Sequence, residues 1–495
     1  MRLGLAIGMT VLAGAAWAED PVQLKVMSFN IWYGGDQVSF DKVIEAIRAA
    51  DADIVGLQEP DGKTLVIAAA AGYPYADTRR HILSRYPLFD SGLGETQGAA
   101  APPYSIAGVD PGAVHAWALV APGKAVAVAN THLTSDPYGP ELVRDGSTLA
   151  EVLQNEADTR MPEAQALIDG LGPVIASGAP VILTGDFNSP SWRDWTGRAP
   201  FPVEWPVSKA MEAAGFTDSY RAAHPDAAMN PGLTWTAGRP WPVVPEGETL
   251  DRIDFVWAAN AKVTNSTVVG EPGFADAGVT VAPWPSDHRG VMSTLEVVPV
   301  EAPALVAVEP RLVREGGDFL IRVNSPRGAV YSVAVVPAGG DGVEGAVTGI
   351  AEVDPADRPT IRLSTLGLSP GAWDAVMLGD EARELARTRF HVVPADGKAV
   401  LALAQDKVPP GGDIALRFAG APGFKLDWVG IYRKGAPSVY DYLGFAYTGA
   451  RISGDLVFPA SELYEELAPG EYEARLMFDD HYRVMAIAPF TVVEK

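Results

Sequence analysis

The residues best suited to chemistry are carboxylates, amides and imidazoles that follow short apolar runs. Five segments of this kind end predicted β-strands, where loops present side chains to a cleft, and a sixth places a carboxylate inside a strand. Such a set can hold a hard divalent cation through oxygen ligands and can move protons. The segments are Ser28-Phe29-Asn30, Leu57-Gln58-Glu59, Asn130-Thr131-His132-Leu133, Thr184-Gly185-Asp186-Phe187-Asn188, Ser286-Asp287-His288 and, inside a strand, Asp251-Arg252-Ile253-Asp254.

Each segment also has an ordinary structural interpretation. Glu59 alone is typical of a strand-end carboxylate in water, and His132 alone of a partly buried histidine. Asp186 and Asn188 suit a turn that their own side chains stabilise. All these interpretations must hold at once for the chemistry to be absent, so the order and strand context of the segments favour a functional site.

The composition narrows the chemistry further. The chain has 495 residues, no cysteine, and 38 Lys and Arg against 62 Asp and Glu, for a formal net charge of −24. Without cysteine there are no disulfides, thiolate metal sites or cysteine nucleophiles, so any metal must be held by Asp, Glu, Asn or His. The acidic balance argues against nonspecific binding to nucleic acid or anionic membranes, because that affinity comes from Lys and Arg. Nucleic acid therefore remains a candidate only as a substrate.

The N-terminus reads as a secretory signal peptide over residues 1–18. Arg2 supplies the positive charge, Leu3 to Ala16 the apolar stretch, and Ala16-Trp17-Ala18 the cleavage site. A membrane anchor is the alternative, but the apolar run is short for a bilayer. We therefore expect an exported protein, periplasmic or extracellular, with no stable membrane anchor. The sequence predicts no oligomeric state.

Between residues 19 and 298, apolar runs alternate with segments of helical period, which is typical of an α/β fold. A helix is expected over residues 40–50, after Ser39, which can cap it. The expected strands are residues 24–30, 54–58, 125–129, 181–184, 253–257 and 291–297.

An internal repeat marks the remaining third of the chain. Gly316-Gly317-Asp318 returns as Gly411-Gly412-Asp413, and Phe390-His391-Val392-Val393 as Phe490-Thr491-Val492-Val493, at offsets of 95 and 100 residues. That spacing suits one immunoglobulin-like sandwich. We expect two tandem immunoglobulin-like β-sandwiches, over residues 299–395 and 396–495.

The six segments, in this order, resemble the motifs of the endonuclease/exonuclease/phosphatase superfamily, which includes DNase I-like nucleases, sphingomyelinases and phosphatases. The resemblance covers about residues 20 to 297. It implies that residues 19–298 form a DNase I-like α/β sandwich of two sheets and hydrolyse a phosphate ester with the help of a metal.

Attack on a phosphate ester builds negative charge, which a cation with oxygen ligands neutralises. Glu59 is the first expected ligand, with Asn30 and Asp287 next to the cation directly or through water. The resemblance implies the same ligands and favours Mg²⁺, with Mn²⁺ or Ca²⁺ as alternatives.

Asp186 is expected to orient and deprotonate the attacking water, and Asn188 to donate its amide to a nonbridging oxygen. His288 is expected to be a charged donor to the phosphate, and the resemblance assigns Asp254 to hold its ring. His132 is expected to contact the phosphate or to help protonate the leaving group. Attack is then direct and in line.

Arg85, Trp32 and Arg252 are the expected substrate contacts. Arg85 belongs to the basic cluster of the domain, Trp32 is an aromatic residue beside a motif, and a surface ion pair is the alternative for Arg252.

The expected substrate is a phosphodiester or a phosphomonoester. A secreted DNase I-like nuclease is the alternative, which the small size of the basic cluster weakens. The rival from another class is a noncatalytic protein that binds surfaces through its sandwiches, and the complete set of site residues argues against it.

Overall fold

The computed structural model describes residues 21–78, 80–90, 114–197, 200–325, 331–340, 360–421, 427–439, 441–449, 451–478 and 481–494. The predicted signal peptide lies outside these residues. Within them, no helix has both the length and the apolar character needed to cross a membrane.

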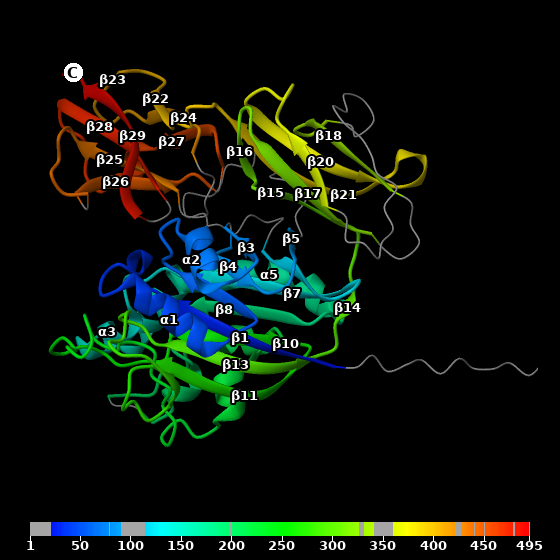
Figure 1. Ribbon diagram of the computed structural model, residues 1–495. Coiled ribbons are helices and arrows are strands. Elements are labelled where there is room, and N and C mark those ends of the chain that lie inside the picture. Colours follow the sequence, from blue (N-terminus) through cyan, green and yellow to red (C-terminus); the bar gives the residue numbers. More distant parts are fainter. Residues whose placement is uncertain are drawn as a thin grey trace, which may run out of the picture.

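Two β-sheets form the centre of the N-terminal part (Figure 1). Their strands are β1 (Val22–Asn30), β2 (Ile54–Gln58), β3 (Tyr75–Asp77), β4 (Ile82–Ser84), β5 (Leu88–Asp90), β6 (Ala116–Ala121), β7 (Lys124–His132), β8 (Val181–Asp186), β9 (Thr217–Asp218), β10 (Asp254–Ala259), β11 (Ala261–Gly270), β12 (Ala277–Thr280), β13 (Gly290–Val297) and β14 (Val300–Glu301). The first sheet has the order β12-β11-β13-β1-β2-β4-β3. The second has the order β5-β6-β7-β8-β10-β9, with β14 paired to β7.

Helices cover the outer faces of both sheets. They are α1 (Phe40–Ala50), α2 (Thr64–Ala71), α3 (Gly139–Arg144), α4 (Leu149–Asp158), α5 (Arg160–Ala176), α6 (Pro206–Ala213) and α7 (Ser219–Ala223), with the short 3₁₀ turns η1 (Tyr33–Gly35) and η2 (Trp192–Asp194). Helices α1 and α2 share a buried cluster with the first sheet, and α5 and α6 share one with the second.

A third apolar cluster lies between the sheets, where Val26 and Ile54 of the first meet Val128 and Ile182 of the second. The period-two alternation of the strands explains this division, because Met27 and Phe29 of β1 face the helices while Val26 faces the opposite sheet. The result is a sandwich of two sheets between two helical layers.

The predicted α/β architecture is confirmed. The expected helix over residues 40–50 is α1, and the Ser39 side chain accepts a hydrogen bond from Lys42 N at its N-terminus. Each expected strand of this part is present within a few residues of its predicted ends. Helices α2 to α7 were not predicted individually.

The C-terminal part consists of β-sheets. Its strands are β15 (Leu305–Glu309), β16 (Leu312–Arg314), β17 (Asp318–Asn324), β18 (Ser332–Pro337), β19 (Thr360–Ser364), β20 (Gly371–Leu378), β21 (Glu384–Val393), β22 (Val400–Leu403), β23 (Lys407–Val408), β24 (Ile414–Ala419), β25 (Trp428–Arg433), β26 (Tyr442–Tyr447), β27 (Gly454–Phe458), β28 (Gly470–Phe478) and β29 (His481–Val492), with 3₁₀ turns η4 (Asp380–Ala382) and η5 (Ala460–Glu462).

These strands form two pairs of facing sheets. Sheet β15-β17-β19 shares a core with β16-β21-β20-β18, and sheet β22-β24-β27 shares one with β23-β29-β28-β25-β26. We call the two pairs the first and second sandwich. The repeated sequence motifs occupy equivalent places, because β16 runs parallel to β21 just as β23 runs parallel to β29. The β-rich prediction holds, while the immunoglobulin-like identity and the domain limits stay predictions.

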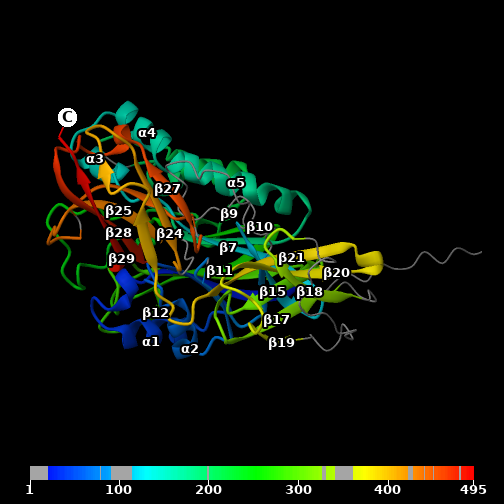
Figure 2. The same cartoon turned by 90° about the horizontal axis from the view of Figure 1, so that it is seen from above.

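The first sandwich is joined to the α/β part through its linker. β14 pairs with β7 as an added edge strand of the second sheet. Leu305 and Ala307 of β15 pack with Phe89, Leu119 and Ala125 in one buried cluster. Figure 2 shows the two sandwiches from above, side by side over the α/β part.

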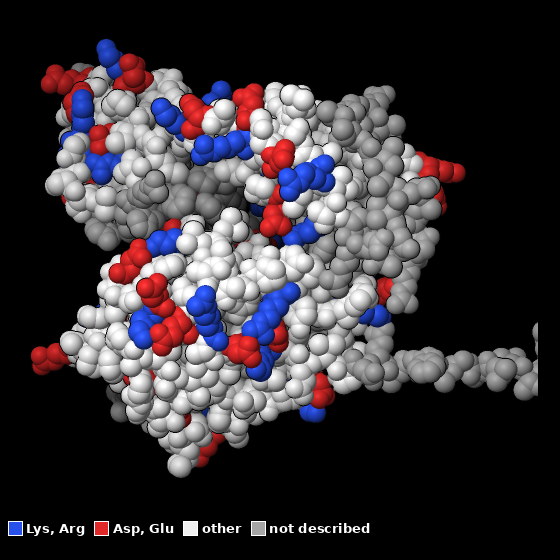
Figure 3. Space-filling model, viewed as in Figure 1, with Lys and Arg blue, Asp and Glu red and all other residues white. Residues whose placement is uncertain are grey.

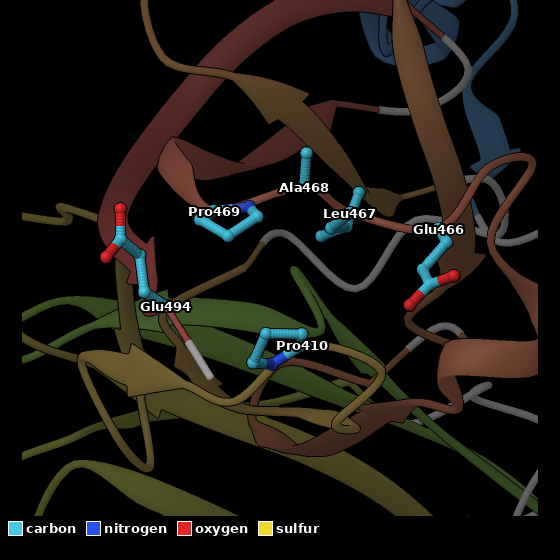
Figure 4. A pocket seen from close by; sticks show the side chains of 6 residues that line it. All are labelled: Pro410, Glu466, Leu467, Ala468, Pro469 and Glu494. Carbon is cyan, nitrogen blue, oxygen red and sulfur yellow. The ribbon is translucent and has the colours of Figure 1, made fainter.

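A hollow of about 420 Å³ lies on the second sandwich (Figure 4). Prolines, Leu467, Ala468 and the carboxylates of Glu466 and Glu494 line it. None of the residues predicted to carry chemistry lies there.

Candidate active site

The register of the central strands brings the predicted residues together. His132 ends β7 and Asp186 ends β8, and these two residues are partners in the parallel pairing of the strands. Asp254 begins β10 and is the antiparallel partner of Asp186. Asn30 ends β1 beside Gln58 of β2, so Glu59 follows at the same edge. The site therefore lies where both sheets end.

A polar network holds the sheets together beneath this edge. Asn130 Nδ2 donates to Leu57 O and Arg80 O, both at 2.8 Å, and its Oδ1 accepts from Gln58 Nε2 at 2.7 Å and from Thr184 Oγ1 at 2.8 Å. Gly56 permits this approach, because a Cβ atom there would stand 1.9 Å from Thr184 Oγ1. The sequence marked the Asn130 segment, but its role as a link between the sheets was not foreseen.

Asp186 is the centre of the site. Its Oδ2 lies 3.1 Å from Asn30 Nδ2 and 3.6 Å from Nε2 of both His132 and His288. Its Oδ1 accepts from the backbone N of Asn188 at 2.9 Å. One buried carboxylate thus faces donors from four different segments.

His288 is held by Asp254, as predicted. Its Nδ1 lies 3.0 Å from Asp254 Oδ2. Burial disfavours the charged imidazole, but the carboxylates of Asp254 and Asp186 outweigh this and raise the pKa of His288 to about 10. Burial also raises the pKa of Asp254, against the charge of His288. His288 is therefore a cation at neutral pH.

Glu59 and Asp287 form the oxygen-rich side. Glu59 Oε1 accepts from Asn30 Nδ2 at 3.0 Å and its Oε2 from the backbone N of Tyr33 at 2.9 Å. Burial, together with the charge of Glu59, raises the pKa of Asp287 to about 7, although His288 opposes the rise. Asn30 presents its amide nitrogen to Glu59 and Asp186, while its Oδ1 accepts from Trp32 N at 3.0 Å. Asn30 thus links two carboxylates here, and its role as a ligand stays a prediction.

A divalent cation fits this side of the site, because two carboxylates destabilise each other's charge unless a cation offsets it. A second buried group, Asp186, Asp254 and His288, brings ligand atoms within 4.8 Å of one another. In that group Nδ1 of His288 is already engaged with Asp254 at 3.0 Å, so this nitrogen is not available as a ligand. The oxygen pair of Glu59 and Asp287 is the better match for a hard cation.

His132 and Asn188 complete the second-sheet side. Asn188 Nδ2 donates to Leu133 O at 2.9 Å, which uses one of the two amide hydrogens that the sequence assigned to substrate. Below them, the buried Arg160 donates to Thr134 O at 2.9 Å and to Pro137 O at 2.8 Å. Arg160 thereby fixes the loop after His132, a role that a lone arginine within a helical pattern does not reveal.

Two predicted substrate contacts lie elsewhere. Arg85 pairs with Asp51 at 2.5 Å and with Asp53 at 3.3 Å, before the start of β2 and opposite the end that leads to Glu59. Arg252 is 1% exposed, and its guanidinium donates to Asp194 at 3.0 Å and to Asp218 at 3.0 and 2.7 Å. The structure therefore places both side chains away from the candidate site, because carboxylates engage the buried guanidinium of Arg252 and Arg85 pairs with carboxylates at the other end of β2. Trp32 does lie at the site, through its bond to Asn30.

Sequence reasoning missed the segment before β10. The Trp235 ring lies 4.7 Å from that of His288, and Thr234 Oγ1 accepts from the backbone N of Ile253 and of Asp254. Arg239 Nε lies 3.7 Å from Asp287 Oδ2. The only sequence signal was an aromatic residue in a loop.

Residues 27–288 match the model of the Endonuclease/Exonuclease/phosphatase family, and the chain belongs to this family. Its class is therefore that of the phosphoester hydrolases, in the broad sense of nucleases and phosphatases.

Individual relatives are distant. An uncharacterized protein of Caenorhabditis elegans is 26% identical over 263 residues, which cover 47% of this chain and 78% of that protein. A crystal structure of an endonuclease/exonuclease/phosphatase from Beutenbergia cavernae is 18% identical and covers 74% of this chain and 99% of its own, with a TM-score of 0.34. An AP endonuclease from Archaeoglobus fulgidus is 17% identical and covers 55% of this chain and 98% of its own, also with a TM-score of 0.34.

Proposed function

We propose that the chain is an exported, divalent-metal-dependent phosphoesterase that hydrolyses a phosphodiester or a phosphomonoester by in-line attack of water. The observation that carries the proposal is the surroundings of Asp186, whose Oδ2 lies 3.6 Å from Nε2 of both His132 and His288. A carboxylate among fixed donors can orient a water molecule and accept its proton.

His288 stabilises the phosphoryl oxygens as charge develops on them. Its pKa of about 10 keeps it cationic at neutral pH, and Asp254 at 3.0 Å fixes the ring so that Nε2 faces the site. His132, whose side chain is 18% exposed, is the proposed contact of the leaving group.

Glu59 and Asp287 are the proposed ligands of the cation, with Asn30 beside them. When bound, a divalent cation supplies positive charge to the phosphoryl oxygens. Mg²⁺ is the first candidate because all these donors are hard oxygens, and Mn²⁺ and Ca²⁺ are the alternatives.

The test is a substrate panel with wild-type protein and Asp186→Asn. Bis-p-nitrophenyl phosphate, p-nitrophenyl phosphate, duplex DNA, RNA and sphingomyelin are each offered with Mg²⁺, Mn²⁺ or Ca²⁺. Wild type turns over at least one substrate, EDTA abolishes the turnover, and Asp186→Asn lowers it by about 10²- to 10⁴-fold. Asp145→Asn, at a surface aspartate paired with Arg144, is the control with unchanged activity. Wild-type activity in Asp186→Asn would contradict the proposal.

A nuclease remains the alternative within this class. On the face that Figure 3 shows, Lys and Arg side chains alternate with Asp and Glu and form no basic track for a long polyanion. The net charge of −24 also disfavours a long polyanion and so favours small substrates, and turnover of duplex DNA above both nitrophenyl substrates would reverse the preference.

Export is tested separately. The proposed signal peptide predicts a secreted or periplasmic product that begins at Glu19, which N-terminal mass analysis of fractionated cells can detect. Full-length protein confined to the cytoplasm would contradict export and leave the proposed chemistry untouched.

A further inference from the structure

Arg239 approaches the site from the side of Asp287. Its Nε lies 3.7 Å from Asp287 Oδ2, and its guanidinium carbon lies 4.0 Å from the centre of the Trp235 ring. The same tryptophan ring lies 4.7 Å from the ring of His288. Trp235 therefore contacts both the proposed transition-state donor and this second cation.

The loop that carries Arg239 is anchored to the site. Ala237 N and Thr236 Oγ1 both donate to Asp287 O at 2.8 Å. Arg239 N donates to Val243 O at 2.7 Å, which closes the loop. The position of the guanidinium is thus tied to that of a proposed metal ligand.

The guanidinium of Arg239 differs from those of the buried arginines. Arg252 and Arg289 spend their donors on carboxylates and carbonyls. The Arg239 side chain is 43% exposed, and across the described residues its only polar contact is the ion pair with Asp287, which is longer than a hydrogen bond. The contact of the guanidinium with the Trp235 ring engages no oxygen acceptor, so N–H groups of Arg239 stay available to an anion.

The carboxyl groups of the site explain why an anionic substrate would need a positively charged donor such as Arg239. Glu59, Asp186, Asp254 and Asp287 line the site with four carboxyl groups. Ionised carboxylates repel an anionic substrate. Arg239 supplies the missing positive charge at the exposed rim, and a dianion gains more from a fixed charge than a monoanion does.

We propose that Arg239 binds a nonbridging oxygen of the substrate phosphate and makes the site favour dianionic phosphomonoesters over monoanionic diesters. The inference deepens the proposed function and rests on it. Two in-plane N–H groups match two phosphate oxygens, which a lysine cannot reproduce.

The test compares Arg239→Gln and Arg239→Lys with wild type, in the full chain. For Arg239→Gln, KM for p-nitrophenyl phosphate and the dissociation constant of inorganic phosphate, measured by calorimetry with Mg²⁺ present, rise about 10- to 100-fold. The rise in KM for bis-p-nitrophenyl phosphate is smaller, and kcat changes less than KM. Arg239→Lys recovers part of the affinity, and added guanidinium ion partly rescues Arg239→Gln. Arg193→Gln is the matched control, because Arg193 also stacks on a tryptophan, at 4.6 Å from Trp192, and pairs with Glu212.

Other outcomes overturn the inference. An unchanged phosphate dissociation constant in Arg239→Gln shows that Arg239 does not bind phosphate. Loss of Mg²⁺ affinity and of kcat, with no rescue by guanidinium, shows that Arg239 only positions Asp287. Turnover of diesters alone overturns the stated preference. If wild type hydrolyses none of the substrates, the proposed function fails, whereas the phosphate titration still decides whether Arg239 binds phosphate.

Discussion

Two aspartates with no exposed surface, Asp254 in the candidate active site and Asp374 in the first sandwich, have opposite electrostatic surroundings. Asp254 has one cationic partner, His288, and its Oδ1 has no hydrogen-bond partner in the described part of the chain. Asp374 accepts from Arg389, from Arg387 at 2.7 Å and from the backbone N of Gly339 at 2.8 Å.

The pKa values of Asp254 and Asp374 follow from these partners. Burial raises the pKa of Asp254, and the negative charge of Asp186 adds to the rise. Burial also acts to raise the pKa of Asp374, but the bonds from Arg389, Gly339 and Arg387 outweigh it and the pKa falls. A buried carboxylate with several donors stabilises the fold, whereas the raised pKa of Asp254, which has one cationic partner, is common at functional sites.

The largest expected effect is on activity and comes from the site that contains Asp254. His288→Ala removes the charged donor beside Asp186 and lowers kcat/KM by about 10²- to 10⁴-fold. Circular dichroism and thermal melting show a folded protein. His224→Ala, at a histidine bonded to Ser266 O, is the control with unchanged kcat/KM. Activity of His288→Ala within tenfold of wild type would remove this histidine from the mechanism.

In the first sandwich, Asp374→Asn leaves two arginines without their buried partner. The expected loss of local stability is about 3–5 kcal/mol. Hydrogen exchange of β20 and β21 measures it, because these strands carry Asp374 and both arginines. Activity per folded molecule stays at the wild-type level. Exchange that is equally slow in wild type and variant would contradict the assignment of Asp374 to stability.

The stabilising role of Asp374 can also be tested through its dependence on pH. Because the pKa of Asp374 is lower in the folded chain than its ordinary value of 3.8, its contribution to stability is fully present above that value and is lost as pH falls through the folded pKa. Protection of β20 and β21 should therefore decline in wild type between about pH 4 and pH 2, and less steeply in Asp374→Asn. Parallel declines in the two proteins would argue against the ionised aspartate as the cause.

The smallest expected effect comes from Arg85→Gln. Arg85 pairs with Asp51 and Asp53 at the opposite end of β2 from Glu59, and its side chain is 43% exposed. We expect kcat/KM to change by less than about twofold, since exposed ion pairs contribute little. A tenfold loss of activity would return Arg85 to the substrate site.

Sequence reasoning succeeded where chemistry follows strand ends. Asp186 and His132 could be predicted to meet because each follows a short buried strand, whereas Asp254 was assigned to His288 through the family resemblance. It failed where the question was whether a side chain was already engaged. Nothing local to Arg252 shows that Asp194 and Asp218, distant in the chain, consume its donors.

Arg239 is the opposite case, a residue at the site that sequence reasoning did not identify. The sequence places it in a Pro-rich loop with no motif, and bonds from Ala237 N and from the Thr236 hydroxyl to Asp287 O bring this loop to the site. Long-range bonds of this kind leave no periodic trace in the sequence.

Gly56 determines how closely the two sheets of the α/β part approach each other beneath the candidate site. Asn30, Glu59 and Asp287 lie at or near strand ends of one sheet, whereas His132, Asp186 and Asp254 lie at strand ends of the other, so the candidate active site spans the two sheets. Gly56 lets the two sheets approach each other at this point, because any side chain there would clash with Thr184 and Asn130. The geometry of the candidate site therefore depends on how closely the two sheets pack, and a side chain at position 56 would change it without touching any residue of the site.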